Sequence, residues 1–110
     1  MGTAQNDRQD IAETEADVKP SSPKRPPLYH VVVLNDDYTP MDFVIEALME
    51  VFAFDSMSAE AIMLAIHQQG RGVCGTFSKD VAQTKQQQIQ ALARAEGHPL
   101  TAIVEPVTAT

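Results

Sequence analysis

The sequence has little of what several protein classes require. Its single cysteine, Cys74, excludes an internal disulfide and a cysteine-based metal cluster, and indicates a reducing compartment. Aromatic residues make up 5% of the chain and all lie between positions 29 and 77, so we expect the core around that stretch. No run approaches the ~20 apolar residues of a membrane span, and residues 1–10 lack the basic start and apolar middle of a signal peptide. We therefore expect a cytoplasmic protein that does not enter membranes.

Basic residues are also scarce. The 110-residue chain has 8 Lys and Arg against 15 Asp and Glu, a formal net charge of -7. Such a charge repels the phosphate backbone, which supplies most of the affinity of nucleic-acid binders. We therefore expect no nucleic-acid partner. The length allows one compact domain and excludes a multidomain enzyme.

The N-terminal quarter of the chain differs in composition from the rest. Residues 1–27 contain no aromatic residue and few large aliphatic ones, so they offer too little apolar surface to offset the entropy of ordering. Prolines are frequent in residues 19–27 and favour extended chain. We predict a disordered tail at 1–27, a domain at 28–106 and a short C-terminal tail at 107–110.

Hydrophobic spacing within the domain predicts six elements. Short β-branched and aromatic runs predict strands, and apolar residues at helical spacing predict helices. In chain order these are a strand at 29–34, helices at 40–52 and 56–69, a strand at 73–77, a helix at 79–96 and a strand at 100–104. This β-α-α-β-α-β order predicts an α/β (α+β) fold, in which three helices cover a three-stranded antiparallel sheet.

Turn and cap residues separate these elements. Thr39, Asp55 and Ser78 are expected to cap the three helices, with Pro40 at the first helical position. Gly70 is suited to a left-handed residue at the end of the second helix. The glycines on either side of Cys74 favour a close backbone approach or a bulge in the second strand.

A polar triplet follows the first predicted strand and leads into a helix. Side chains in such loops commonly face a ligand, so Asn35, Asp36 and Asp37 are candidates for a binding site. Asn and Asp also favour turns for local hydrogen-bonding reasons, and from this segment alone both interpretations stay open. His67 lies on the same helical face as Met63, where an isolated histidine is more often structural.

Catalytic alternatives have weaker support. A small hydrolase or metal-binding site formed by Asp36, Asp37 and His67 is one alternative, although the spacing of an enzymatic zinc site is absent. A nucleophilic pair of Cys74 and His67 is another, but no polarising neighbour is visible that would lower the pKa of the thiol.

Four motifs together resemble one protein family. The run from Tyr29 to Val44 contains the string NDDYTPM, and it is followed by MLAIHQQG at 63–70, CGTF at 74–77 and EGHPL at 96–100. In this order and spacing they resemble ClpS, the adaptor of the bacterial ATP-dependent Clp protease. The resemblance extends over about residues 29–105.

The resemblance implies a function without catalysis or cofactor. ClpS-like adaptors bind substrates with a large hydrophobic N-terminal residue (the N-degron: Leu, Phe, Tyr or Trp) and deliver them to the ClpA unfoldase of the ClpAP protease. It implies a monomer in which Asn35, Asp36 and His67 bind the substrate α-amino group, and Asp37 has a mainly local role. The implied side-chain pocket consists of Thr39, Met41, Met63, Ile66 and Leu100. Asp80 and Lys85 are the implied contacts with the unfoldase.

The residue types suit that task. A buried α-ammonium needs an acceptor for each of its three N–H donors, and an amide oxygen, a carboxylate and a neutral imidazole nitrogen supply them. A buried Leu or Phe side chain adds roughly 1.5 to 3 kcal/mol of hydrophobic stabilisation.

Overall fold

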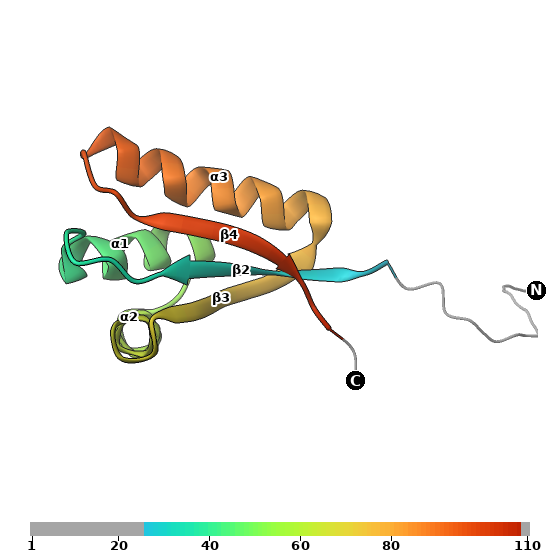
Figure 1. The fold of residues 1–110 in the computed structure, drawn as a ribbon, viewed down its shortest axis with the longest axis horizontal. Coiled ribbons are helices and arrows are strands. Elements are labelled where there is room, and N and C mark those ends of the chain that lie inside the picture. Colours follow the sequence, from blue (N-terminus) through green and yellow to red (C-terminus); the bar gives the residue numbers. More distant parts are fainter. Residues whose placement is uncertain (1–25, 109–110) are drawn as a thin grey trace, which may run out of the picture.

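The computed structural model describes residues 26–108 and confirms the predicted order of elements (Figure 1). The elements are β2 (Leu28–Leu34), α1 (Met41–Phe52), α2 (Ser56–Gln69), β3 (Arg71–Ser78), α3 (Lys79–Ala95) and β4 (Thr101–Pro106). The predicted N-terminal tail lies outside the described residues, apart from the exposed residues 26 and 27. Among residues 26–108, no helix combines the length and apolar character that a bilayer crossing needs.

The three strands form one antiparallel sheet in the order β3-β2-β4. The register between β2 and β3 shifts between Val31, which pairs with Gly75, and Val32, which pairs with Val73. Cys74 is therefore the extra residue of a bulge, as the flanking glycines predicted. The bulge leaves Cys74 buried, with 2% of its surface exposed.

The core lies between the sheet and the helices. Val33 of β2, Leu48 of α1 and Ile89 of α3 are almost fully buried and belong to one cluster. On α1 the predicted polar residues Asp42 and Glu46 are exposed, in agreement with its amphipathic spacing. α3 packs across the sheet and contacts all three strands; in the view of Figure 1 it runs beside β4.

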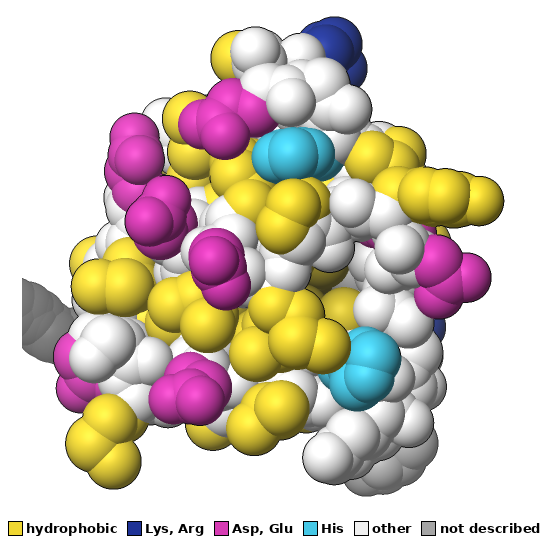
Figure 2. All heavy atoms as spheres, turned by 90° about the vertical axis from the view of Figure 1, so that its left-hand side faces the viewer, with side chains coloured by type: hydrophobic (Ala, Val, Ile, Leu, Met, Phe, Trp, Pro, Cys, Tyr) yellow, Lys and Arg dark blue, Asp and Glu magenta, His cyan; other side chains and the backbone are white. Residues whose placement is uncertain are grey.

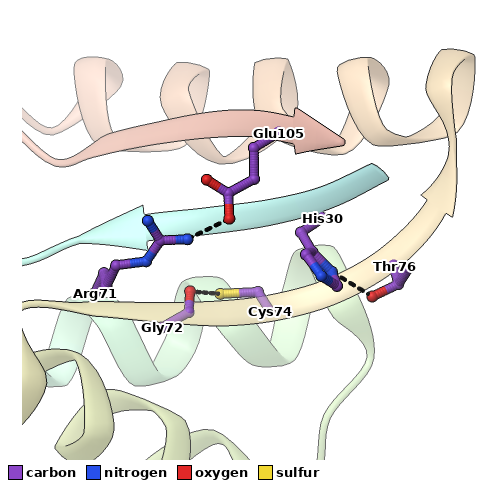
Figure 3. Close-up of polar contacts among 6 residues, drawn as sticks. All are labelled: His30, Arg71, Gly72, Cys74, Thr76 and Glu105. Atoms are coloured by element: carbon purple, nitrogen blue, oxygen red, sulfur yellow. Dashed lines mark hydrogen bonds and ion pairs between the residues drawn. The ribbon is translucent and has the colours of Figure 1, made fainter. Parts of the chain in front are cut away.

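The other face of the sheet carries polar contacts (Figure 3). Arg71 of β3 forms an ion pair with Glu105 of β4, so this pair spans the central strand β2. Arg71 is opposite Leu34 and Glu105 is opposite His30. The ion pair therefore passes over Val32, which has 0% exposure although it alternates with the core-facing valines.

The helix ends agree with the sequence in part. The Asp55 carboxylate caps α2 by accepting from the Ser58 N–H at 2.8 Å, and Gly70 ends α2 with a φ of 89°. The expected Thr39 cap of α1 is wrong, because Pro40 occupies the N-cap position and α1 begins at Met41. Ser78 is the N-cap residue of α3 as expected, but its side chain makes no capping hydrogen bond.

Candidate functional site

A cavity of about 250 Å³ opens at one end of the molecule, where the loop after β2 meets α1, α2 and the residue before β4. Figure 2 shows this end, with hydrophobic side chains near its centre and acidic and histidine side chains around them. All eight residues expected to bind the ligand line the cavity: Asn35, Asp36, Thr39, Met41, Met63, Ile66, His67 and Leu100. The fold therefore gathers them from four separate segments of the chain.

The ends of β2 and α2 are joined at the mouth of the cavity. Gly70 adopts the left-handed conformation and donates its N–H to the Ile66 carbonyl at 2.9 Å. The Gly70 carbonyl in turn accepts from the Asn35 N–H at 2.9 Å. These two bonds place Asn35 beside the last turn of α2, which carries His67. Both side chains are exposed and line the cavity.

Asp36 organises the loop that forms the cavity rim. Its Oδ1 accepts from the N–H groups of Tyr38 and Thr39 at 2.8 and 2.7 Å, and its Oδ2 accepts from the Thr39 hydroxyl at 2.8 Å. A carboxylate offers about four acceptor sites, so one on Oδ2 is left for a ligand. The Thr39 hydroxyl bonds to Asp36 instead of capping α1, which explains the difference from the expected cap.

The local hydrogen bonds also keep Asp36 ionised. Partial burial raises the pKa of its carboxyl, but the bonds from Thr39 and Tyr38 and the charge of His98 lower it. The net effect is a pKa below the ordinary value of 3.8. The cavity rim therefore carries a fixed negative charge at neutral pH. We expected the mainly local role for Asp37, but Asp36 makes these bonds, and Asp37 is an exposed residue of the cavity lining.

The interior of the cavity is hydrophobic. Met63, Ile66 and Leu100 are buried, whereas Met41 lies at the rim with 43% of its surface exposed. Three further residues line the cavity that the sequence did not single out: Val33, Leu34 and Val44. Their positions on a predicted strand and on the apolar stripe of a predicted helix indicated only core packing.

The catalytic alternatives are not supported by the arrangement of the side chains. Among residues 26–108, no three His, Cys, Asp or Glu side chains are placed to hold a metal ion together, so Asp36, Asp37 and His67 do not form the metal site considered above. Burial raises the pKa of the Cys74 thiol to about 12, and Cys74 is not among the residues that line the cavity. A thiol with that pKa is not an activated nucleophile at neutral pH.

The two residues expected to contact an unfoldase lie outside this cavity, on α3. Asp80 is exposed in the first turn of α3. The Lys85 Nζ is partly buried and donates to the Val51 carbonyl in the last turn of α1 at 2.8 Å. Because α1 has no basic residue in its own last turn, Lys85 supplies the cation that stabilises this helix end. Lys85 thus has a structural role that its spacing did not indicate.

Comparisons with known proteins identify the family. The family profile described as "ATP-dependent Clp protease adaptor protein ClpS" matches residues 24–103. The ClpS adapter protein of Neisseria gonorrhoeae is 54% identical over 85 residues, which are 77% of this chain and 79% of the relative. That of Methylococcus capsulatus is 55% identical over 82 residues, 74% of this chain and 77% of the relative.

A solved structure agrees with this match. Agrobacterium tumefaciens ClpS2, bound to L-phenylalaninamide, superposes with a TM-score of 0.74 at 37% identity, covering 76% of this chain and all of that one. The fold and the site thus define a small α/β domain with an open cavity lined by apolar and hydrogen-bonding side chains. The chain belongs to the ClpS family of ATP-dependent Clp protease adaptors.

Proposed function

We propose that this protein binds polypeptides whose N-terminal residue is large and hydrophobic, and delivers them to the ClpA unfoldase of the ClpAP protease. The observation that carries the proposal is the cavity, which combines a hydrophobic interior with acceptor side chains at its mouth. The ligand of the A. tumefaciens relative supports it, because L-phenylalaninamide is a hydrophobic residue with a free α-amino group.

The mouth of the cavity suits an α-ammonium group. The Asn35 amide offers an oxygen, a ring nitrogen of His67 can serve as an acceptor, and Asp36 contributes its charge and its remaining acceptor site. Hydrogen bonds that involve a charged group contribute roughly 1.5 to 3 kcal/mol each. An internal residue of a polypeptide presents one neutral N–H in place of three charged ones. The mouth therefore discriminates in favour of a free N-terminus.

The interior suits one side chain. Its volume of about 250 Å³ lies just below the ~300 to 1,000 Å³ typical of sites for whole drug-sized ligands. Met41 and Met63 adapt to aliphatic and aromatic ligands alike, because thioethers are flexible and contact ring edges favourably. We propose Leu, Phe, Tyr and Trp as the first residues that bind.

Delivery needs a second surface and no catalytic step. We propose that exposed Asp80 contacts the unfoldase, that Lys85 supports this surface through its bond to Val51, and that residues 1–27 assist delivery. In this proposal the protein acts in the cytoplasm as a monomer without cofactor and without enzymatic activity.

Peptide titration tests the proposal. Peptides that differ only at residue one, each with a free and an acetylated N-terminus, are titrated against the full chain. We expect saturable binding of free Leu and Phe peptides and at least a tenfold loss on acetylation, because the charged hydrogen bonds are removed. Asn35→Ala and His67→Ala should weaken free-peptide binding about tenfold or more, whereas the exposed neighbour Gln68→Ala should not. Equal affinity for free and acetylated peptides would contradict the proposal, and turnover of a peptide would favour a hydrolase.

A further inference from the structure

We infer that Gln86 and Gln90 of α3 are positioning residues that hold one wall of the cavity and thereby set its preference among first residues of different size. The inference rests on the proposed function, because it concerns the size of the ligand side chain that the same cavity accepts. Neither glutamine lines the cavity. Both act through β4.

The two glutamines bind the main chain of a single strand residue. The Gln90 Oε1 accepts from the Ala102 N–H at 2.6 Å, and the Gln86 Nε2 donates to the Ala102 carbonyl at 2.9 Å. Gln86 and Gln90 are four residues apart on α3, so their side chains project from the same helical face. Ala102 lies in an edge strand, and both of its main-chain polar groups are satisfied by side chains of α3.

This tether lies next to the wall of the cavity. Leu100, two residues before Ala102, lines the cavity with 2% of its surface exposed. On the neighbouring strand β2, Ala102 pairs with Val33, which lines the same cavity. A shift of Ala102 along or away from β2 would therefore change the spacing of two lining residues.

A second attachment holds the chain on the other side of Leu100. The His98 N–H donates to the Ala93 carbonyl of α3 at 2.8 Å, and the His98 ring packs edge-on against Phe43 with centroids 4.7 Å apart. Leu100 thus lies between two residues, His98 and Ala102, whose main chains are each hydrogen-bonded to α3. The hydrogen bond of His98 joins two main-chain groups and cannot be removed by changing a side chain. The two hydrogen bonds of Ala102 come from glutamine side chains, which can be mutated separately.

The polarity of the two bonds allows a sharp test. Gln90→Glu keeps an acceptor for the Ala102 N–H, whereas Gln86→Glu places a carboxylate against the Ala102 carbonyl oxygen. The two variants have the same composition and net charge and differ only in which bond is altered. Gln90→Ala removes the acceptor, and Gln87→Ala, at an exposed position of the same helix, is the matched control.

The readout is the ratio of the dissociation constants of free Leu and free Trp peptides, with the thermal midpoint and the amide exchange of Ala102 measured in parallel. We expect Gln90→Ala and Gln86→Glu to change this ratio about fivefold in favour of the larger Trp peptide, which corresponds to the loss of one hydrogen bond. Both variants should also speed amide exchange at Ala102. Gln90→Glu and Gln87→Ala should keep the wild-type ratio.

The outcomes separate this inference from the proposed function. An unchanged ratio in both Gln90→Ala and Gln86→Glu, with wild-type binding of free peptides intact, would overturn the positioning role and leave the proposed function standing. A lower thermal midpoint with the same ratio would show that the glutamines only stabilise the edge strand. A wild-type protein that does not distinguish free from acetylated peptides would overturn both.

Discussion

The two ends of the core are packed with different kinds of side chain. At the end away from the cavity, aromatic rings fill the space: Phe52 lies 6.2 Å from Phe54 and 6.3 Å from Phe77 between ring centroids. At the other end, Met63, Ile66 and Leu100 surround a cavity of about 250 Å³. The end away from the cavity is therefore packed with three rings, whereas the cavity end, where Phe43 and His98 also pair, leaves space that a ligand side chain can fill.

At each of these two ends, one glycine of β3 lies in close contact with a neighbouring side chain. A Cβ at Gly75 would lie 2.5 Å from the Phe77 ring and 3.6 Å from the Phe52 ring. A Cβ at Gly72 would lie 2.6 Å from the Ile66 Cγ1. Both glycines are needed for close approach and not for a positive φ, and the neighbour of Gly72, Ile66, lines the cavity described above. The same substitution should therefore have different consequences at the two ends.

The largest effect is expected at the aromatic end. Phe52→Ala should lower the free energy of unfolding by about 2 to 4 kcal/mol, somewhat below the usual cost of removing a fully buried ring because Phe52 is half-buried. Its affinity for a free Leu peptide should stay within about twofold of wild type. Urea unfolding and peptide titration measure the two quantities. Loss of peptide binding in the folded variant would show that the two ends are coupled.

The next prediction compares the two glycines directly. Gly75→Ala should lower the free energy of unfolding by about 1 to 3 kcal/mol, because Phe77 is packed against Phe52 and has to shift. Gly72→Ala should cost less, under about 1.5 kcal/mol, because Ile66 has the cavity to move into. That movement narrows the cavity, so Gly72→Ala should weaken peptide binding more than Gly75→Ala does. The reverse order in either measurement would contradict the comparison.

Much of the fold was predictable because its signals are local. The strand at the centre of the sheet is rich in β-branched and aromatic residues, the helices have apolar residues at helical spacing, and Asp55 and Gly70 cap α2 as expected. The Thr39 cap was wrong for an equally local reason. Asp36, three residues earlier, competes for the same hydroxyl, and the sequence alone does not decide between two local hydrogen-bonding patterns.

The composition of the cavity was less accessible from the sequence. The resemblance to a family indicated which residues to examine, whereas periodicity alone favoured ordinary core packing for Met41 and Met63. Hydrogen bonds between residues far apart in the sequence have no sequence pattern that predicts them. Lys85 and Val51 are 34 residues apart, and Gln90 and Ala102 are 12 residues apart. Both depend on how α3 packs, which a pattern of residues along one helix does not reveal.

The smallest effect is expected at the cavity rim, where Asp36 holds the loop between β2 and α1. Asp36→Ala should lower the free energy of unfolding at pH 7 by about 1 kcal/mol, because two main-chain N–H groups and a hydroxyl lose their acceptor. Asp36→Asn keeps an oxygen that can accept from Tyr38 and Thr39, so it should lower the free energy of unfolding by less than Asp36→Ala does.

The pH dependence separates the charge of Asp36 from its hydrogen bonds. Because folding lowers the pKa of this carboxyl below 3.8, the ionised group stabilises the folded protein above that pH, and the stabilisation is lost as the pH falls through the lower folded value. The difference in stability between wild type and Asp36→Asn should therefore be largest at neutral pH and shrink below about pH 4. Urea unfolding at pH 7 and at pH 3 measures it. A difference that is equal at both values would mean that the charge of Asp36 does not contribute, and that the rim is held by the geometry of the acceptor alone.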